Sequence, residues 1–333
     1  IGLMMIGTIL MLVTPGYATI GIAAPLIITL ARLLQGFSVG GEFGSAVSFL
    51  VEHGYERKGY AASWQWASTG IISVVISLFG VVLTTTLSHQ ELVAWGWRIP
   101  YVFGLLVGPA GLYIRSRMAE TPEFLEAAKP ESVPIGHLLR RYPVPVLLAL
   151  GASIISNSSY YLLLYIPTYG IKTLHLPAYT GFVATLVGGV ILGIFSLVAG
   201  HWSDRTERAP IMLAMGGLFL VTAYPVFWLM VAYPSLAACV FAVGWLNLVK
   251  AGYSGVLPSL LSEQFPVEVR AVGVAFSYSI SVTIFGGFAP LVATWLIAHT
   301  GDSLSPSYYL MATALLSIVA LIAVQRRSAR RWR

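Results

Sequence analysis

Residues 177–210 read PAYTGFVATLVGGVILGIFSLVAGHWSDRTERAP, a long apolar run that ends in a short charged loop. The apolar part, 177–202, has the length of a helix that crosses a bilayer core of about 30 Å, which takes roughly 20 residues. Hydrocarbon offers no partners to backbone N–H and C=O groups, so only helix bundles and closed barrels span it, and this run is too long for a barrel strand. The stretch therefore predicts a transmembrane helix followed by a polar turn.

The same pattern recurs along the whole chain, whose 333 residues are 57% hydrophobic and only 10% charged. This composition lies far from that of soluble domains. Pro and Gly stand at the joins between the apolar runs, where they interrupt helices. We predict an all-α integral membrane protein with ten spans, at 2–14, 21–51, 60–87, 97–117, 144–169, 177–202, 209–232, 235–261, 269–298 and 306–326.

One long polar connection, 118–143, separates four predicted spans from six. It predicts a partial N-terminal helical bundle (1–117), a cytoplasmic loop (118–143) and a six-helix bundle with a basic tail (144–333). Transporters are commonly built from equivalent repeats, and the ends of the second and eighth spans both read carboxylate, short loop, Arg, Gly and new helix. This match makes the ten spans helices 3 to 12 of twelve. The chain begins inside an apolar run without a basic region or cleavage pattern, which favours a truncated start over a signal peptide.

The distribution of the 19 Lys and Arg residues predicts the orientation, because basic residues accumulate in cytoplasmic loops. Most of them fall in one alternate set of loops and in the C-terminal tail. Only Arg98 and Lys172 lie in the opposite set, while Arg32 and Lys250 lie within spans. We therefore expect a multi-pass protein of the bacterial inner membrane with both ends of the chain in the cytoplasm.

Other classes of protein and site lack their signatures. The net charge of +6 follows from the loop asymmetry, so it does not indicate nucleic-acid binding. The single Cys239 and the six histidines, which fall in loops or at helix ends, offer no metal centre and no proton relay at mid-membrane. No H-E-x-x-H, paired Asp or Cys–His motif predicts an enzyme. A channel or a sensor would show a pore loop or a soluble domain, and neither is present.

Residues 200–208, GHWSDRTER, resemble the G-x-x-x-D-R-x-x-R signature of the major facilitator superfamily, in the copy between helices 8 and 9. In such loops Arg side chains can pair with carboxylates at neighbouring helix ends and hold an inner gate closed. We expect Glu263 to pair with Arg205 or Arg208. The alternative is an ordinary solvated turn. The predicted gate residues are Asp204, Arg205, Arg208, Glu263, Glu52 and Arg270.

Three further segments, 32–44 (RLLQGFSVGGEFG), 59–65 (GYAASWQ) and 95–100 (WGWRIP), resemble the metabolite:proton symporters of that superfamily. Within this family, 164–169 (LYIPTY) and 285–290 (FGGFAP) look most like the citrate and tricarboxylate symporters. The resemblance implies a major facilitator helix bundle, transport by alternating access, a monomer and no cofactor. The first two helices and the first signature loop of the family are absent from this chain.

Three ionisable residues lie well inside predicted spans, where they are costly and therefore indicate function. Two of them, Arg32 and Lys250, are cations, so a transported carboxylate could supply the missing negative charge. Arg32 could equally serve as a structural pair. Glu42 is the only carboxylate within a span, and it could carry the coupled proton or act as a fixed partner.

Polar neighbours predict the rest of a binding cavity. Asn247 and Lys250 are three residues apart, and Asn157 and Tyr161 are four apart, so each pair shares a helix face. The predicted substrate-binding residues are Arg32, Lys250, Gln65, Asn157, Tyr161 and Asn247. Trp64 is a further candidate, and the glycines near these segments, such as Gly36, Gly44, Gly189 and Gly193, favour close helix packing.

These features together predict a secondary transporter that carries a small organic anion, a di- or tricarboxylate such as citrate, with protons. Its partners are then the anion, protons and the lipid bilayer, without metal, cofactor or nucleic acid. The alternatives are a proton-coupled symporter of a zwitterionic osmolyte such as betaine or proline, and an inactive fragment of such a transporter.

Overall fold

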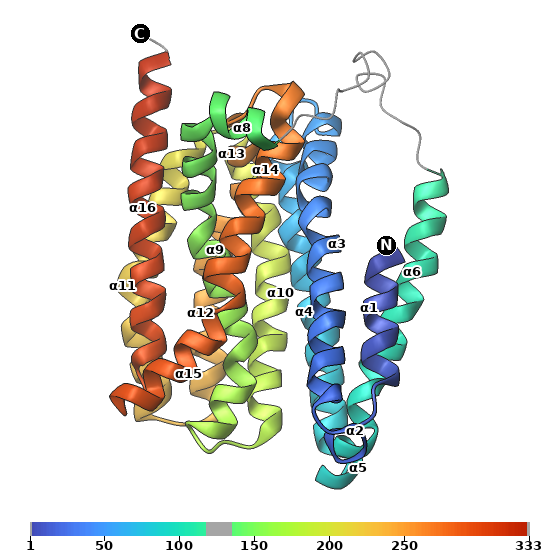
Figure 1. Cartoon of the computed structure of the whole chain (residues 1–333). Helices are drawn as coiled ribbons and strands as arrows, with labels where there is room; N and C mark the ends of the chain where they lie inside the picture. The colour runs from blue at the N-terminus through green and yellow to red at the C-terminus, as the bar shows by residue number, and fades with distance from the viewer. Residues whose placement is uncertain (1, 118–134, 332–333) are drawn as a thin grey trace. The chain divides into compact units, whose positions relative to one another are not determined.

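The computed structural model describes residues 2–117 and 135–331, and within those ranges it contains helices and turns without a strand (Figure 1). The first part comprises α1 (Gly2–Val13), α2 (Tyr17–Ile20), α3 (Ala23–His53), α4 (Lys58–Thr86), α5 (His89–Ala94), η1 (Gly96–Arg98) and α6 (Ile99–Arg117). The second part comprises α8 (Ile135–Arg141), α9 (Pro143–Lys172), α10 (Ala178–Ser203), α11 (Arg208–Ala232), α12 (Leu236–Ser254), α13 (Leu257–Glu263), α14 (Val267–Ser281), η2 (Val282–Gly287), α15 (Ala289–Thr300) and α16 (Ser305–Arg331).

Every predicted span falls on helix, which confirms the all-α membrane class. Within the described residues, seven helices are long and apolar enough to cross a membrane: Lys58–Thr86, Pro143–Lys172, Ala178–Ser203, Arg208–Ala232, Leu236–Glu263, Val267–Thr300 and Ser305–Arg327. Two shorter apolar helices, Gly2–Val13 and Ala23–Gly36, match the starts of the first two predicted spans. The number of helices that would precede α1 stays a prediction.

Two predicted spans are interrupted. The eighth consists of α12 and α13, and Pro258 stands in the first turn of α13, where its missing N–H costs nothing. The ninth consists of α14, a π-helical turn from Val282 to Gly287, and α15, which has Pro290 in its first turn. Residues 118–134 of the predicted loop lie outside the described residues, and its remainder forms the short helix α8 rather than an irregular loop.

The described chain divides into two compact units, one made of Ile1–Phe43 and Leu83–Pro134, the other of Gly44–Val82 and Ile135–Arg333. The predicted division at the central loop places α3 and α4 wholly with the first bundle. In the structure the second half of α3 and most of α4 group with the later helices instead. The physical reason is close packing of these segments against α14 and α10.

Unit 2 is built around α9, which contacts α10, α14 and α16, while α12 contacts α10 and α11 (Figure 1). Small residues let α4 approach α10: a Cβ added to Gly70 would lie 2.7 Å from the backbone oxygen of Gly189. The predicted packing role of Gly189 is thus met, and Gly44 similarly faces Ala275 of α14. Gly36 is different, because a Cβ there would meet nothing within 4 Å.

Unit 1 pairs α1 with α6. Arg98 fastens the C-terminal end of α1, since its guanidinium donates to the backbone oxygens of Leu12 and Thr14, both at 3.0 Å. These carbonyls have no partner within their own helix, so a cation there is favourable. Ser88 and Glu91 form a capping box that starts α5.

Candidate functional site

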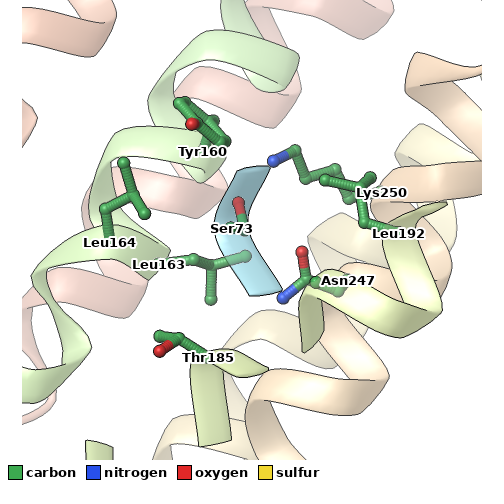
Figure 2. Close-up of a pocket in the computed structure, with 9 residues that line it drawn as sticks. Ser73, Tyr160, Leu163, Leu164, Thr185, Leu192, Asn247 and Lys250 are labelled. Carbon is green, nitrogen blue, oxygen red and sulfur yellow. The ribbon is translucent and has the colours of Figure 1, made fainter. Parts of the chain in front are cut away.

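The most unusual side chain of unit 2 is Lys250, in the middle of α12. It is only 2% exposed. Its Nζ lies 4.5 Å from the centroid of the Tyr160 ring on α9 and 5.0 Å from that of the Trp66 ring on α4. Figure 2 shows the Lys250 side chain reaching toward Tyr160 across the segment of α4 that carries Ser73. Three helices that are distant in sequence therefore converge on one ammonium group.

Within the described part of the chain, Lys250 Nζ has neither a hydrogen-bond partner nor a carboxylate within 4.0 Å. Removing a lone ammonium from water costs roughly several kcal/mol even after the protein relaxes. A cation over an aromatic face recovers only about 2 kcal/mol in a desolvated site. The two rings therefore offset the cost in part, and the site lacks a negative charge.

A second buried donor lies beside Lys250. The indole Nε1 of Trp66 has no acceptor among the described residues, although the Trp66 side chain is only 2% exposed. Trp66 packs with Leu192 and Ala251, and Tyr160 and Tyr278 pack against this cluster. Buried donors without acceptors are rare in folded proteins and call for a physical account. An anion beside Lys250 and Trp66 would supply one.

A cavity of about 20 Å³ adjoins Lys250. This volume holds about one water molecule, so a carboxylate substrate needs the surrounding helices to separate before it fits. Polar groups from four helices face the cavity alongside apolar ones. Its lining consists of Ser73 on α4, Tyr160, Leu163 and Leu164 on α9, Thr185, Gly189 and Leu192 on α10, and Asn247 and Lys250 on α12.

Asn247 and Lys250 line this cavity together, and Asn247 Nδ2 donates to the backbone oxygen of Val243 at 2.9 Å. The other predicted binding residues of unit 2 do not line it. Asn157 is buried and donates from Nδ2 to the Ser281 hydroxyl at 3.1 Å. Tyr161 lies edge-on to Tyr160, with 5.4 Å between the ring centroids. These two residues border the cluster without facing the cavity.

Gln65 is half-buried and also lies outside the cavity lining. On α4 the buried face carries Trp66, Gly70, Ser73 and Ser77 instead. Sequence reasoning missed Trp66 and Ser73 and favoured Trp64, which is 43% exposed. The spacing of small and polar residues from Trp66 onward, in steps of three and four, is the signal that could have found this face.

Arg32 and Glu42 belong to unit 1, whereas Lys250 belongs to unit 2. The Arg32 guanidinium is exposed and donates to Gln35 Oε1 at 3.3 Å and to the Tyr101 hydroxyl at 3.5 Å. Glu42 is also exposed and accepts from Ser38 at 3.5 Å. Their roles in binding and coupling stay predictions.

The charged loop after α10 makes the contacts that a gate would need. Arg208 forms an ion pair with Glu263 at the end of α13, one of the two predicted pairings, and lies 3.9 Å from Asp204. The Asp204 carboxylate also accepts backbone N–H groups of Gly59 at 2.6 Å and Tyr60 at 2.9 Å, at the start of α4. Sequence reasoning missed this second contact.

The remaining predicted gate residues do not form ion pairs of this kind in the part of the chain that the structure describes. Arg205 is exposed and Glu52 is half-buried at the end of α3. Arg270 donates from Nε to the backbone oxygen of Ser262 at 3.0 Å, so it holds the turn between α13 and α14. Their role in a gate stays a prediction.

Comparison with known proteins places this arrangement in a family. A family model described as Major Facilitator Superfamily matches residues 1–281. The chain belongs to the major facilitator superfamily. It is 34% identical to a citrate-proton symporter of Klebsiella pneumoniae, over 99% of this chain and 75% of that protein. It is 31% identical to a putative proline/betaine transporter of Staphylococcus aureus strain MSSA476, over 96% and 70% of the two chains.

Solved structures of this superfamily share the fold. The crystal structure of a D-xylose-proton symporter superimposes with a TM-score of 0.63 at 17% identity, over 96% of this chain and 80% of that one. The fold class and the family resemblance predicted from sequence are thereby confirmed. As a major facilitator protein the chain is a multi-pass membrane transporter and not an enzyme.

Proposed function

We propose that the chain is a proton-coupled symporter of a small organic anion, a di- or tricarboxylate such as citrate. It works as a monomer in a bacterial inner membrane with both described ends on the cytoplasmic side. The observation that carries the proposal is the buried Lys250 amine, which has no hydrogen-bond partner within the described residues and can carry its charge there only beside an anion. Two relatives named citrate-proton symporters, 34% and 35% identical to this chain, support the same substrate class.

Four polar residues of the cavity have a task in this proposal. Lys250 binds a substrate carboxylate through a charge-assisted hydrogen bond, which is roughly twice as strong as a neutral one. The hydroxyls of Ser73 and Thr185 and the amide of Asn247 line the same space and can bind a second carboxyl or hydroxyl group of the substrate. A tricarboxylate offers enough acceptors for all of them.

We propose that this conformation, in which the cavity is too small for the substrate, stands between substrate loading and release. The charged contacts of Asp204 and Arg208 lie at the end of unit 2 that the basic loops assign to the cytoplasm. We propose that they keep the cytoplasmic side closed, and that separation of α4 from α10 opens it. Alternating access of this kind uses rigid helices that move about a fixed binding site.

A betaine or proline symporter is the second candidate, because relatives with those names match at 31% identity and because Trp66 and Tyr160 could surround a quaternary ammonium. In this structure, however, the Lys250 amine already occupies the space over both ring faces. A quaternary ammonium would have to displace it. The arrangement therefore favours an anion.

Uptake of labelled citrate by the chain in proteoliposomes, with and without an imposed pH gradient, tests the proposal. We expect the gradient to drive accumulation, and we expect excess unlabelled tricarboxylate but not betaine to compete. Gradient-driven uptake of betaine, with none of any carboxylate, would establish the second candidate instead.

A further inference from the structure

Lys250 borders two separate spaces along α12. Toward the start of this helix lies the cavity with Ser73, Thr185 and Asn247. Toward its end lies a smaller recess that is closed to water in this conformation. The recess is lined by Ile155, Ser156, Ser159, Phe219, Lys250, Tyr253 and Ser254. Lys250 is the residue common to both spaces, and both carry hydroxyl groups.

These two spaces lie on opposite sides of Lys250 along α12. Asn247 lies about one turn before Lys250 on α12, and Ser254 lies about one turn after it. The helix continues through Ser254 to α13, whose last residue Glu263 pairs with Arg208. A group at Lys250 can therefore face one side of the membrane through the cavity and the other through the recess when the gate contacts break.

No described carboxylate of unit 2 forms an ion pair with this amine. Every described carboxylate except Glu42 lies in a loop or near a helix end, at Glu52, Glu56, Glu91, Asp204, Glu207, Glu263, Glu268 and Asp302. The titratable groups that surround Lys250 are tyrosines: Tyr160 and its neighbour Tyr161 on α9, Tyr253 on α12 and Tyr278 on α14. The hydroxyl of Tyr253 donates to the backbone oxygen of Ala152 at 2.7 Å.

We propose that Lys250 itself carries the coupled proton: it is a neutral amine in the empty closed transporter and becomes an ammonium when the substrate anion binds. This deepens the proposed function and rests on it. Burial disfavours the charged form of an unpaired amine, and a neighbouring anion restores it. Binding of a carboxylate and uptake of a proton are then one linked event.

The cycle balances in protons, because each turnover carries one proton across with one substrate anion. A hydronium ion from the open side gives its proton to the amine as the carboxylate arrives and becomes water, and the ammonium and carboxylate form a pair over the Trp66 and Tyr160 rings. On the other side the carboxylate leaves and the ammonium returns that proton to water through the recess. An empty transporter with a neutral, buried Lys250 can then reorient without a charge in its core. This assigns coupling to Lys250 in place of Glu42, which is exposed.

The experiment compares Lys250→Arg with wild type in proteoliposomes, using labelled citrate. Arg binds carboxylates but keeps its proton. We expect Lys250→Arg to retain citrate exchange between the two sides while losing accumulation driven by a pH gradient. The matched control is Lys172→Arg, at an exposed lysine in the last turn of α9, which should behave as wild type.

A measurement on wild-type protein covers the case in which Lys250→Arg does not fold. Between about pH 7.5 and 9.5, where the carboxyls of citrate are ionised, the affinity for citrate should fall by up to about tenfold per pH unit, because binding must take up a proton. Full gradient-driven accumulation by Lys250→Arg, or a citrate affinity independent of pH in wild type, would overturn the proposal. Absence of any citrate binding by wild type would instead refute the proposed function.

Discussion

Replacing Asp204 by Asn tests the cytoplasmic gate through a change of one charge. The Asp204 carboxylate accepts two backbone N–H groups at the start of α4, from Gly59 and Tyr60, at 2.6 and 2.9 Å. Such a carboxylate also interacts favourably with the helix dipole. An Asn side chain keeps the shape but loses the charge, and hydrogen bonds to neutral groups are about half as strong.

The loss can be estimated from these contacts. Each charge-assisted hydrogen bond contributes roughly 1.5–3 kcal/mol to the closed state, and about half is lost in the Asn variant. Two bonds then give a loss of about 2 kcal/mol. At roughly 1.4 kcal/mol per tenfold change, the ratio of open to closed transporters rises by about 30-fold.

Labelling of a single cysteine measures this ratio. In a Cys239→Ser background, Ser254→Cys places a thiol in the recess below Lys250, which opens when the gate opens. We expect an impermeant thiol reagent added from the cytoplasmic side to label the Asp204→Asn variant about 30-fold faster than the parent, following the population shift. Asp302→Asn is the control, because Asp302 accepts bonds only within its own loop region. Equal labelling rates in all three proteins would refute the gate.

Three further predictions concern stability. Arg98→Lys should lower the free energy of unfolding by about 1–2 kcal/mol, because one ammonium cannot replace both guanidinium bonds to the C-terminal end of α1. Thermal unfolding in detergent measures this loss, and an unchanged unfolding midpoint would contradict the role of Arg98 at the helix end. Gly70→Ala should cost about 1–3 kcal/mol by forcing α4 from α10, whereas Gly36→Ala should not destabilise, and equal midpoints for the two would refute the close approach. The Ser88 hydroxyl and backbone N–H donate to the Glu91 carboxylate and lower its pKa below the ordinary value of 4.5. Its capping contribution is therefore complete above that value and is lost as pH falls through the lowered pKa. An NMR titration that gives Glu91 a pKa at or above 4.5 would contradict this.

The helices were predictable because each needs a long apolar run, and such runs are visible without knowledge of their neighbours. The face that each helix turns inward was much harder to predict. Lipid and protein interior are both apolar, so α4 shows little amphipathic contrast, and Trp64 was favoured over the buried Trp66. Only polar residues within an apolar helix, such as Asn247 and Lys250 on α12, indicated which face of the helix points inward.

Contacts between distant segments could not be predicted from the sequence for a different reason. The charges of the loop after α10 suggested that Glu263 pairs with Arg205 or Arg208, because opposite charges at helix ends attract, and the structure selects Arg208. The bonds from Asp204 to Gly59 and Tyr60 join backbone groups that carry no signal in the side chains. The π-helical turn of Val282–Gly287 likewise depends on packing, where the Tyr309 hydroxyl donates to the Phe285 backbone oxygen at 2.5 Å.

The most direct measurement of anion and proton movement uses lightly buffered proteoliposomes and a pH electrode. Citrate added outside should make the external medium more alkaline as protons enter with it, and betaine should not. Lys250→Gln, which removes the amine, should abolish both the pH change and citrate entry. Citrate entry without a pH change in wild type, or an unaltered pH change in Lys250→Gln, would contradict a proton-coupled anion symporter centred on Lys250.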